Sequence, residues 1–325
     1  MSSRTRRRIA EFWIWWDKHG DAIASAISAG TVASWVPEIT TVVRAINRGL
    51  VWELMPGSQA THALVVTCEG SPDLFEVAED WLAGGPPDDA TWEYHSSRPP
   101  GSLDTLTVDG FAFDLAGVRS RWTRDEGREQ LDVELWHPAW PELSTRARWI
   151  SAQLFLDRLL GEADKQRWIG VVNPVDSAAD GAEPAALRMA VGDLAGASTG
   201  QKWTTIERRQ DDGRALLLTM NEALKRIDHP RKTCHLVVSV SRDSRTLEAP
   251  SALNVEDLVA LLEGQDARLA AVVADAHRSI FHFVADPSQG AIVSAIAWAE
   301  DISKVSVTSA ADPAWRFRDD LILGN

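Results

Sequence analysis

Residues 235–241, which have the sequence HLVVSVS, decide the fold of the second half of the chain. Leu236, Val238 and Val240 alternate with other residues, so one face of an extended segment is apolar and the other is largely polar. A helical pattern follows at 254–264, where apolar residues recur three and four positions apart until a glycine ends it. We therefore expect a strand with one covered face, followed by a helix.

The same two patterns continue from there to residue 309. They predict, in order, two strands joined as a hairpin, a second helix and a last strand. These segments are 269–274, 279–284, 286–299 and 305–307. The order β-α-β-β-α-β is that of the ferredoxin-like unit, in which both helices lie on one face of an antiparallel sheet and the other face is open. The predicted fold class is α+β.

Strand and helix patterns recur upstream in a less regular order. Strands are expected at 62–67, 92–96, 106–114, 118–123, 131–136 and 168–172, and helices at 72–82 and 144–160. A helix pair is expected before them, in the first 46 residues. A further strand at 215–220 and a closing helix from Asp312-Pro313 flank the C-terminal unit. The N-terminal part is thus predicted to be a related α+β half.

Three segments follow from these patterns. Residues 1–175 form an N-terminal α+β domain with a helical, tryptophan-rich start. Residues 176–200 are rich in Gly, Ala and Ser and are predicted to be a linker that carries a short helix around 187–194. Residues 201–325 form the ferredoxin-like domain.

The charge balance excludes some classes of partner. Thirty-three Lys and Arg against 47 Asp and Glu give a net charge of −14, which argues against nucleic acid as a direct partner. No stretch approaches the roughly 20 apolar residues of a membrane helix. Two cysteines, Cys68 and Cys234, are too few for a disulfide framework or a four-cysteine zinc site. We expect a cytoplasmic protein with an acidic surface.

Fifteen tryptophans accompany a single tyrosine. Their scatter along the chain favours a core role over one ligand cage. The group Trp13, Trp15 and Trp16 follows a basic start, 4–8, and has two interpretations. It packs on its own domain, or it anchors the chain at an anionic lipid surface. Acidic residues interrupt this apolar segment and a helical rhythm follows it, which favours packing.

Four segments of the C-terminal part carry a resemblance to a known family. They are 216–221, 235–240, 277–283 and 312–315. They are similar to a family of bacterial domains of unknown function whose fold resembles that of the B-type regulator of ribonuclease E activity. The resemblance implies a ferredoxin-like α+β domain without an established activity, and an acidic protein that acts on a protein partner. It carries no catalytic residues, and the tryptophan-rich N-terminal half has no counterpart in that regulator.

Short matches to catalytic and metal-binding patterns occur in the sequence, but the predicted helices and strands around them do not suit those functions. Residues 196–200, GASTG, match the G-x-S-x-G pattern, but Ser198 follows a helical pattern and precedes a strand, the reverse of a nucleophile elbow. His277 and His282 point to opposite faces of a strand, as do Cys234 and His235. We therefore predict no metal and no cofactor.

The remaining candidate is the polar face of the C-terminal sheet. Its residues are His235, Ser239, Ser241, Lys304, Ser306 and Thr308. This face is solvent-facing surface, or a platform on which the N-terminal half or another protein docks. The first functional interpretation is a non-enzymatic interaction or regulatory protein. The alternative is a hydrolase-type enzyme with a site in the cleft between the halves. That site would use Arg121, Glu134, His137 and Arg278.

Overall fold

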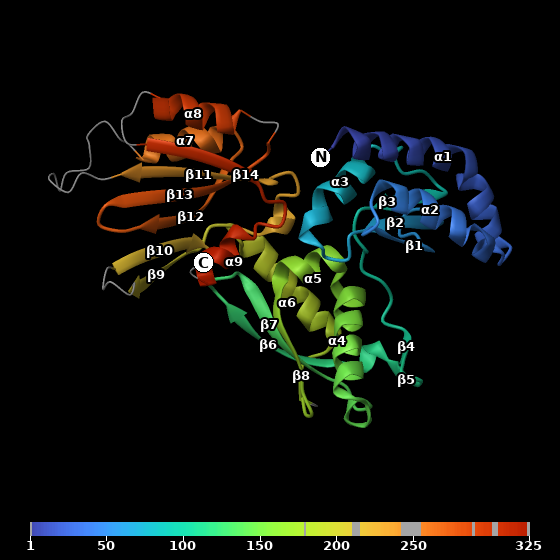
Figure 1. Ribbon diagram of the computed structural model, residues 1–325. Coiled ribbons are helices and arrows are strands. Elements are labelled where there is room, and N and C mark those ends of the chain that lie inside the picture. Colours follow the sequence, from blue (N-terminus) through green and yellow to red (C-terminus); the bar gives the residue numbers. More distant parts are fainter. Residues whose placement is uncertain are drawn as a thin grey trace. The chain divides into compact units, whose positions relative to one another are not determined.

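A computed structural model describes residues 2–178, 180–209, 215–241, 255–287, 290–300 and 305–323 (Figure 1). It is a mixed α+β structure, and its contacts divide the chain into two compact units. Unit 1 comprises residues 1–125 and 130–197, and unit 2 comprises residues 126–129 and 198–325. None of the described helices has the length and apolar character needed to cross a bilayer.

Unit 1 begins with the expected helix pair and a small sheet. The elements are α1 (Ser3–Ser28), α2 (Val36–Ile46), β1 (Val51–Pro56), β2 (His62–Thr67), α3 (Phe75–Ala83) and β3 (Trp92–His95). The strand order is β1-β2-β3, in which β1 and β2 are antiparallel and β2 and β3 are parallel. A crossover through α3 joins the parallel pair, as parallel neighbours require.

The rest of unit 1 has two further sheets. Its elements are β4 (Thr105–Val108), β5 (Phe111–Asp114), β6 (Arg119–Asp125), β7 (Gln130–Trp136), α4 (Thr145–Leu160), α5 (Glu162–Trp168), β8 (Ile169–Pro174) and α6 (Pro184–Ala197). β4 pairs with β5, and β6-β7-β8 form a three-stranded sheet. Trp140 and Phe155 are fully buried in its core, together with Leu187 of α6. The helix within 176–200 therefore contributes to the core of unit 1.

Unit 2 is built on one six-stranded sheet. The elements are β9 (Trp203–Arg209), β10 (Ala215–Asn221), β11 (Cys234–Ser241), α7 (Val255–Gly264), β12 (Arg268–Ala274), β13 (Arg278–Ala285), α8 (Ala291–Glu300), β14 (Val305–Ala311) and α9 (Phe317–Leu323). The strand order is β14-β11-β13-β12-β10-β9, and every neighbouring pair is antiparallel. α7 and α8 cover one face of the sheet (Figure 1). Leu258 and Leu262 of α7 and Ala295 of α8 pack there in one core with Leu236 and Phe283.

Among the described residues, five short 3-10 helices connect these elements. They are η1 (Val32–Trp35), η2 (Pro72–Leu74), η3 (Leu115–Gly117), η4 (Trp140–Glu142) and η5 (Arg226–Asp228).

The second face of this sheet is not open along its whole extent, which corrects the expectation. Leu218, Met220 and Val273 alternate onto this face and are buried with Leu321 of α9. The ring of Phe317 lies 3.9 Å from that of His235, centroid to centroid. The closing helix covers these residues because its own apolar side chains need burial.

The tryptophans at the start of α1 pack inside unit 1. Trp13 and Trp16 are buried, and Trp15 is half-buried. Trp13 stacks on Trp81 at 4.8 Å between centroids, and its Nε1 donates a hydrogen bond to the Trp81 carbonyl. The packing interpretation is therefore confirmed for the two buried rings.

Local backbone chemistry explains where two boundaries differ from the expected ones. The strand predicted at 106–114 is a hairpin, because Asp109 and Gly110 both have positive φ and form its turn. The closing helix begins at Phe317 rather than at 312. Trp315 adopts a left-handed conformation, and the Asp312 carboxylate accepts hydrogen bonds from the backbone N–H groups of residues 316 and 317.

Candidate functional site

A pocket of about 530 Å³ lies beside α5 in unit 1, and we call it the α5 pocket. Its walls come from the turn after β2, from Arg98, from α4 and α5, and from the start of β8. The polar and charged lining residues are Glu69, Arg98, Gln153, Asp157, Glu162, Lys165 and Gln166. The volume falls within the range of small-molecule sites.

Glu162 is a buried carboxylate that holds the wall of the α5 pocket together. It accepts hydrogen bonds from the Thr67 hydroxyl at 2.5 Å, from the Gly70 N–H at 2.8 Å and from the Arg98 N–H at 3.1 Å. Burial, and then the negative charge of Glu162, raise the pKa of the Cys68 thiol to about 11. Cys68 is therefore a neutral, unreactive thiol at neutral pH.

Both cations of the α5 pocket already have carboxylate partners. The Arg98 guanidinium forms a hydrogen-bonded ion pair with Glu53, which raises the pKa of Arg98. The Lys165 Nζ lies 2.8 Å from an Asp157 oxygen. These pairs neutralise the positive charge at the pocket wall.

Two side chains that line the α5 pocket have a group without an interaction partner or with a large exposed area. The Gln166 Nε2 donates a hydrogen bond to the Gly70 carbonyl at 3.0 Å, whereas its Oε1 is buried and has no partner. The ring of Trp149 is 53% exposed although it belongs to a large apolar side chain. An unpaired buried acceptor and an exposed indole are both features that a ligand can satisfy.

The described residues of the polar face predicted in unit 2 lie on one side of β11 and β14. Ser239 pairs with Ser306, and Thr308 pairs with Val237, two residues from His235. Ser241, Ser306 and Thr308 are exposed, whereas His235 lies under Phe317. Lys304 lies outside the described residues.

His235 and His282 form a pair under α9. The His235 Nε2 and the His282 Nδ1 are 3.0 Å apart, and His282 is buried with no partner for its Nε2. Burial, followed by the charge of His235, lowers the pKa of His282 to about 4, and burial also lowers the pKa of His235. Both rings are therefore neutral at pH 7.

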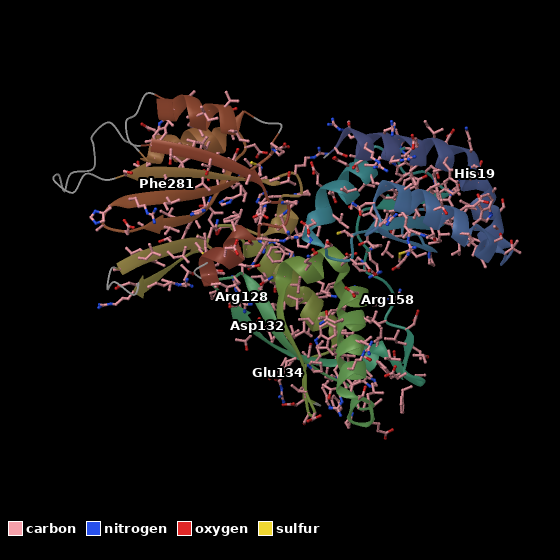
Figure 2. All side chains as sticks on the ribbon, in the orientation of Figure 1. His19, Arg128, Asp132, Glu134, Arg158 and Phe281 are labelled. Atoms are coloured by element: carbon pink, nitrogen blue, oxygen red, sulfur yellow. The ribbon has the colours of Figure 1, made fainter. Side chains whose placement is uncertain are left out.

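The residues proposed for an enzyme site are brought together only in part. Arg121 of β6 and Glu134 of β7 are cross-strand partners and line a second pocket of about 510 Å³ with Asp132 and other residues of this sheet. Figure 2 labels Asp132 and Glu134 on this part of the chain. His137 is buried beside Phe113 and accepts a hydrogen bond from the Ala139 N–H. Arg278 belongs to unit 2, where it pairs with Asp275.

The described residues contain no group of three or more His, Cys, Asp or Glu side chains that could hold a metal ion. The hydroxyl of Ser198 donates a hydrogen bond to the carboxylate of Glu129. Cys234 is a buried free thiol whose pKa is raised by burial.

Sequence reasoning did not identify the α5 pocket. Its residues come from separate segments, and α5 itself was missed because its seven residues lie between two stronger patterns. Glu69-Gly70 was the one available local signal, since an acidic residue and a glycine directly follow the strand 62–67.

Searches against protein-family models, curated proteins and solved structures gave no match for this chain, so its function is inferred from its own residues.

Proposed function

We propose that the protein is a non-enzymatic, cytoplasmic interaction or regulatory protein that binds a protein partner along β9, the edge strand of unit 2. The observation that carries this proposal is the exposure of β9. Six of its seven residues are exposed, so most of the strand is free of cover. Trp203 is 42% exposed and Ile206 is 41% exposed.

The backbone of β9 supports pairing with another chain. β9 ends the strand order, and no described strand pairs with its outer side. Proteins commonly protect such edges with charges, prolines or bulges. The charges of β9 are confined to its end, at 207–209, and the Arg208 guanidinium donates to the carbonyl of Leu321. Trp203–Ile206 is therefore an edge to which an extended peptide can add as a further strand.

One exposed apolar side chain lies on the sheet face next to this edge. The register places Thr219 opposite Val272 and Val272 opposite Phe281, so the odd-numbered residues of β10 share the face that α7 and α8 cover elsewhere. Leu217 lies on this face and is 43% exposed. Alternate side chains of an added strand would contact this face, and the net charge of −14 favours a segment with basic residues.

The order β14-β11-β13-β12, with α7 after β11 and α8 after β13, supports the ferredoxin-like reading of unit 2. The resemblance to a family of bacterial domains of unknown function, whose fold resembles that of the B-type regulator of ribonuclease E activity, implies a protein partner. The buried thiols of Cys68 and Cys234, with raised pKa values, argue against a cysteine nucleophile.

The test uses apolar-to-lysine variants and affinity capture from the native host, followed by cross-linking mass spectrometry. We expect a partner that cross-links to unit 2 near β9 and is captured by the unaltered protein and by Met189→Lys, an exposed substitution on α6. Ile206→Lys and Trp203→Lys should lose it, because a charge at the edge opposes strand addition. Capture should also fall with added salt.

Two results would overturn the proposal. The first is a partner retained equally by Ile206→Lys. The second is a dimer of the unaltered protein, seen by analytical ultracentrifugation, that becomes monomeric in Ile206→Lys, because a second copy of the chain would then occupy the edge.

A hydrolase-type enzyme is the second candidate, and one observation favours it. Asp132 and Glu134 lie two positions apart on β7, about 7 Å along the strand, and line the second pocket with Arg121 and Asn173. Paired carboxylates serve as acid and base in some hydrolases. Hydrolysis of any substrate in a broad panel that Glu134→Gln abolishes would favour this candidate over the interaction protein.

A further inference from the structure

We propose that the α5 pocket binds a small organic cation that carries a primary amine. This site lies in unit 1 and is independent of the proposed function of β9. Its charge is the first argument. Arg98 and Lys165 are both in ion pairs with carboxylates, and two further carboxylates, those of Glu69 and Glu162, line the pocket. The pocket therefore favours positive charge.

The second argument is the orientation of the Gln166 amide. Its Nε2 donates to the Gly70 carbonyl, and the reversed amide would place two acceptor oxygens against each other. The orientation is thus fixed, and the buried atom without a partner is an acceptor, Oε1. An unsatisfied buried acceptor costs free energy, which an N–H donor of a ligand recovers.

The third argument is the face that α4 presents to the α5 pocket. Trp149, Gln153 and Asp157 are spaced by four residues, so an indole, an amide and a carboxylate follow one another along one side of the helix. The exposed indole offers its π face to a cation, and the carboxylate lies at the other end of the row. An anionic ligand would instead be repelled by Glu69 and Glu162.

Cationic groups of this kind occur in free amines and in the Lys and Arg side chains of proteins. The experiment distinguishes these sources by isothermal titration calorimetry of the full chain. The probes are 1,5-diaminopentane as the free amine, N-acetyl-arginine amide as the protein-like group, and glutarate as an anion of similar length. We expect 1,5-diaminopentane to bind with 1:1 stoichiometry and more tightly than the arginine amide. We expect no binding of glutarate.

The variants remove or add single features of the site. Glu69→Gln and Trp149→Ala alter exposed side chains and should each weaken binding of the diamine by about three- to tenfold. Gln153→Glu adds a carboxylate to the α4 face and should tighten it by about threefold, a gain that misfolding cannot produce. Glu38→Gln, on the exposed side of α2, is the charge-matched control and should leave binding unchanged.

Four results would overturn the proposal. The first three are the absence of binding heat for the diamine up to about 10 mM, equal weakening by Glu38→Gln and Glu69→Gln, and tighter binding of glutarate than of the diamine. The fourth is tighter binding of the arginine amide than of the diamine, which would assign the pocket to a basic side chain of a partner protein.

Discussion

Glu93 shows how a single buried carboxylate organises the turn between β1 and β2. It accepts hydrogen bonds from the backbone N–H groups of Ser58, Gln59 and Ala60 at 2.8, 2.7 and 3.0 Å. Burial alone would raise the pKa of Glu93, but these donors outweigh it and lower the pKa to about 2. The carboxylate is therefore charged in the folded protein throughout the neutral and mildly acidic range.

Glu93→Gln should destabilise the protein by about 2 kcal/mol at pH 7, because the amide is a weaker acceptor for three N–H donors. The folded pKa is below the unfolded value, so this stabilisation exists above about pH 4.5 and is lost as the pH falls toward 2. Urea unfolding at pH 7 and pH 3 should show a gap between the two proteins that narrows at pH 3. A constant gap would contradict this role, and Glu38→Gln serves as the control.

The histidine pair under α9 predicts acid sensitivity of unit 2. The unfolded pKa of His282 is near 6.5 and the folded value is about 4, so the unfolded chain binds more protons between these pH values. Stability should therefore fall by about 3 kcal/mol as the pH falls through this window, since one pKa unit corresponds to about 1.4 kcal/mol. Asp312 opposes the shift at His235, and Phe317 stacks on both rings.

His282→Phe should remove the part of the acid sensitivity that His282 causes, because phenylalanine cannot take up a proton. The part caused by His229, whose pKa burial also lowers to about 4, should remain. Chemical unfolding from pH 7 to pH 4, followed by near-UV circular dichroism, measures the effect. His277→Gln, in an exposed turn, should keep the acid sensitivity of the unaltered protein. An equal slope in His282→Phe would mean that other groups cause it.

At the scale of elements, the contact of α1 with the end of α3 depends on a residue without a side chain. A Cβ at Gly85 would meet Cζ2 of Trp13 at 2.6 Å and Cε2 at 2.9 Å. The Trp13 ring cannot move aside, since it stacks on Trp81 and its Nε1 bonds the Trp81 carbonyl. Gly85 therefore permits the close approach of the two helices.

Gly85→Ala should lower the free energy of unfolding by about 1–3 kcal/mol, as overpacking does elsewhere. Gly192→Ala is a matched control in α6, where no atom lies within 4 Å of the added Cβ. That substitution should raise stability by about 0.5–1 kcal/mol through helix propensity. Thermal melts of the two variants should thus shift in opposite directions, and a parallel shift would reject the clash.

The elements that the sequence predicted are those with a periodic pattern and a clear cap. The strand 62–67 matches β2, and Ser144 caps α4 with its hydroxyl, as expected. The elements that were missed are defined by tertiary contacts. Residues 162–168 form a helix because Glu162 is anchored to Thr67 and Gly70, which lie over 90 positions away. No local pattern records such a bond, and the α5 pocket depends on it.

At the scale of the whole molecule, the chain consists of two units that each have a core of their own. α6 belongs to unit 1, where Leu187, Val191 and Leu194 are buried. The position of α6 decides where the chain can be divided, because a helix separated from its core exposes apolar side chains.

Fragments 198–325 and 1–197 should therefore each fold alone, with circular dichroism spectra that add up to that of the full chain. Fragment 1–175 lacks α6 and should be unfolded, or should melt at least about 10 °C below 1–197. Nuclear magnetic resonance and thermal melts of the three fragments measure this. Equal melting of 1–175 and 1–197 would show that α6 is dispensable for unit 1.

Tyr94 is the only tyrosine of the chain, and its ring lies 5.1 Å from that of Trp13 and 6.4 Å from that of Trp16. Its hydroxyl accepts a hydrogen bond from the Trp16 Nε1 at 3.1 Å. At these distances an excited tyrosine transfers its energy to a tryptophan before it can emit. The folded chain should therefore emit only tryptophan fluorescence, and Trp92, two residues from Tyr94 on β3, should keep tyrosine emission weak even when α1 separates from the sheet.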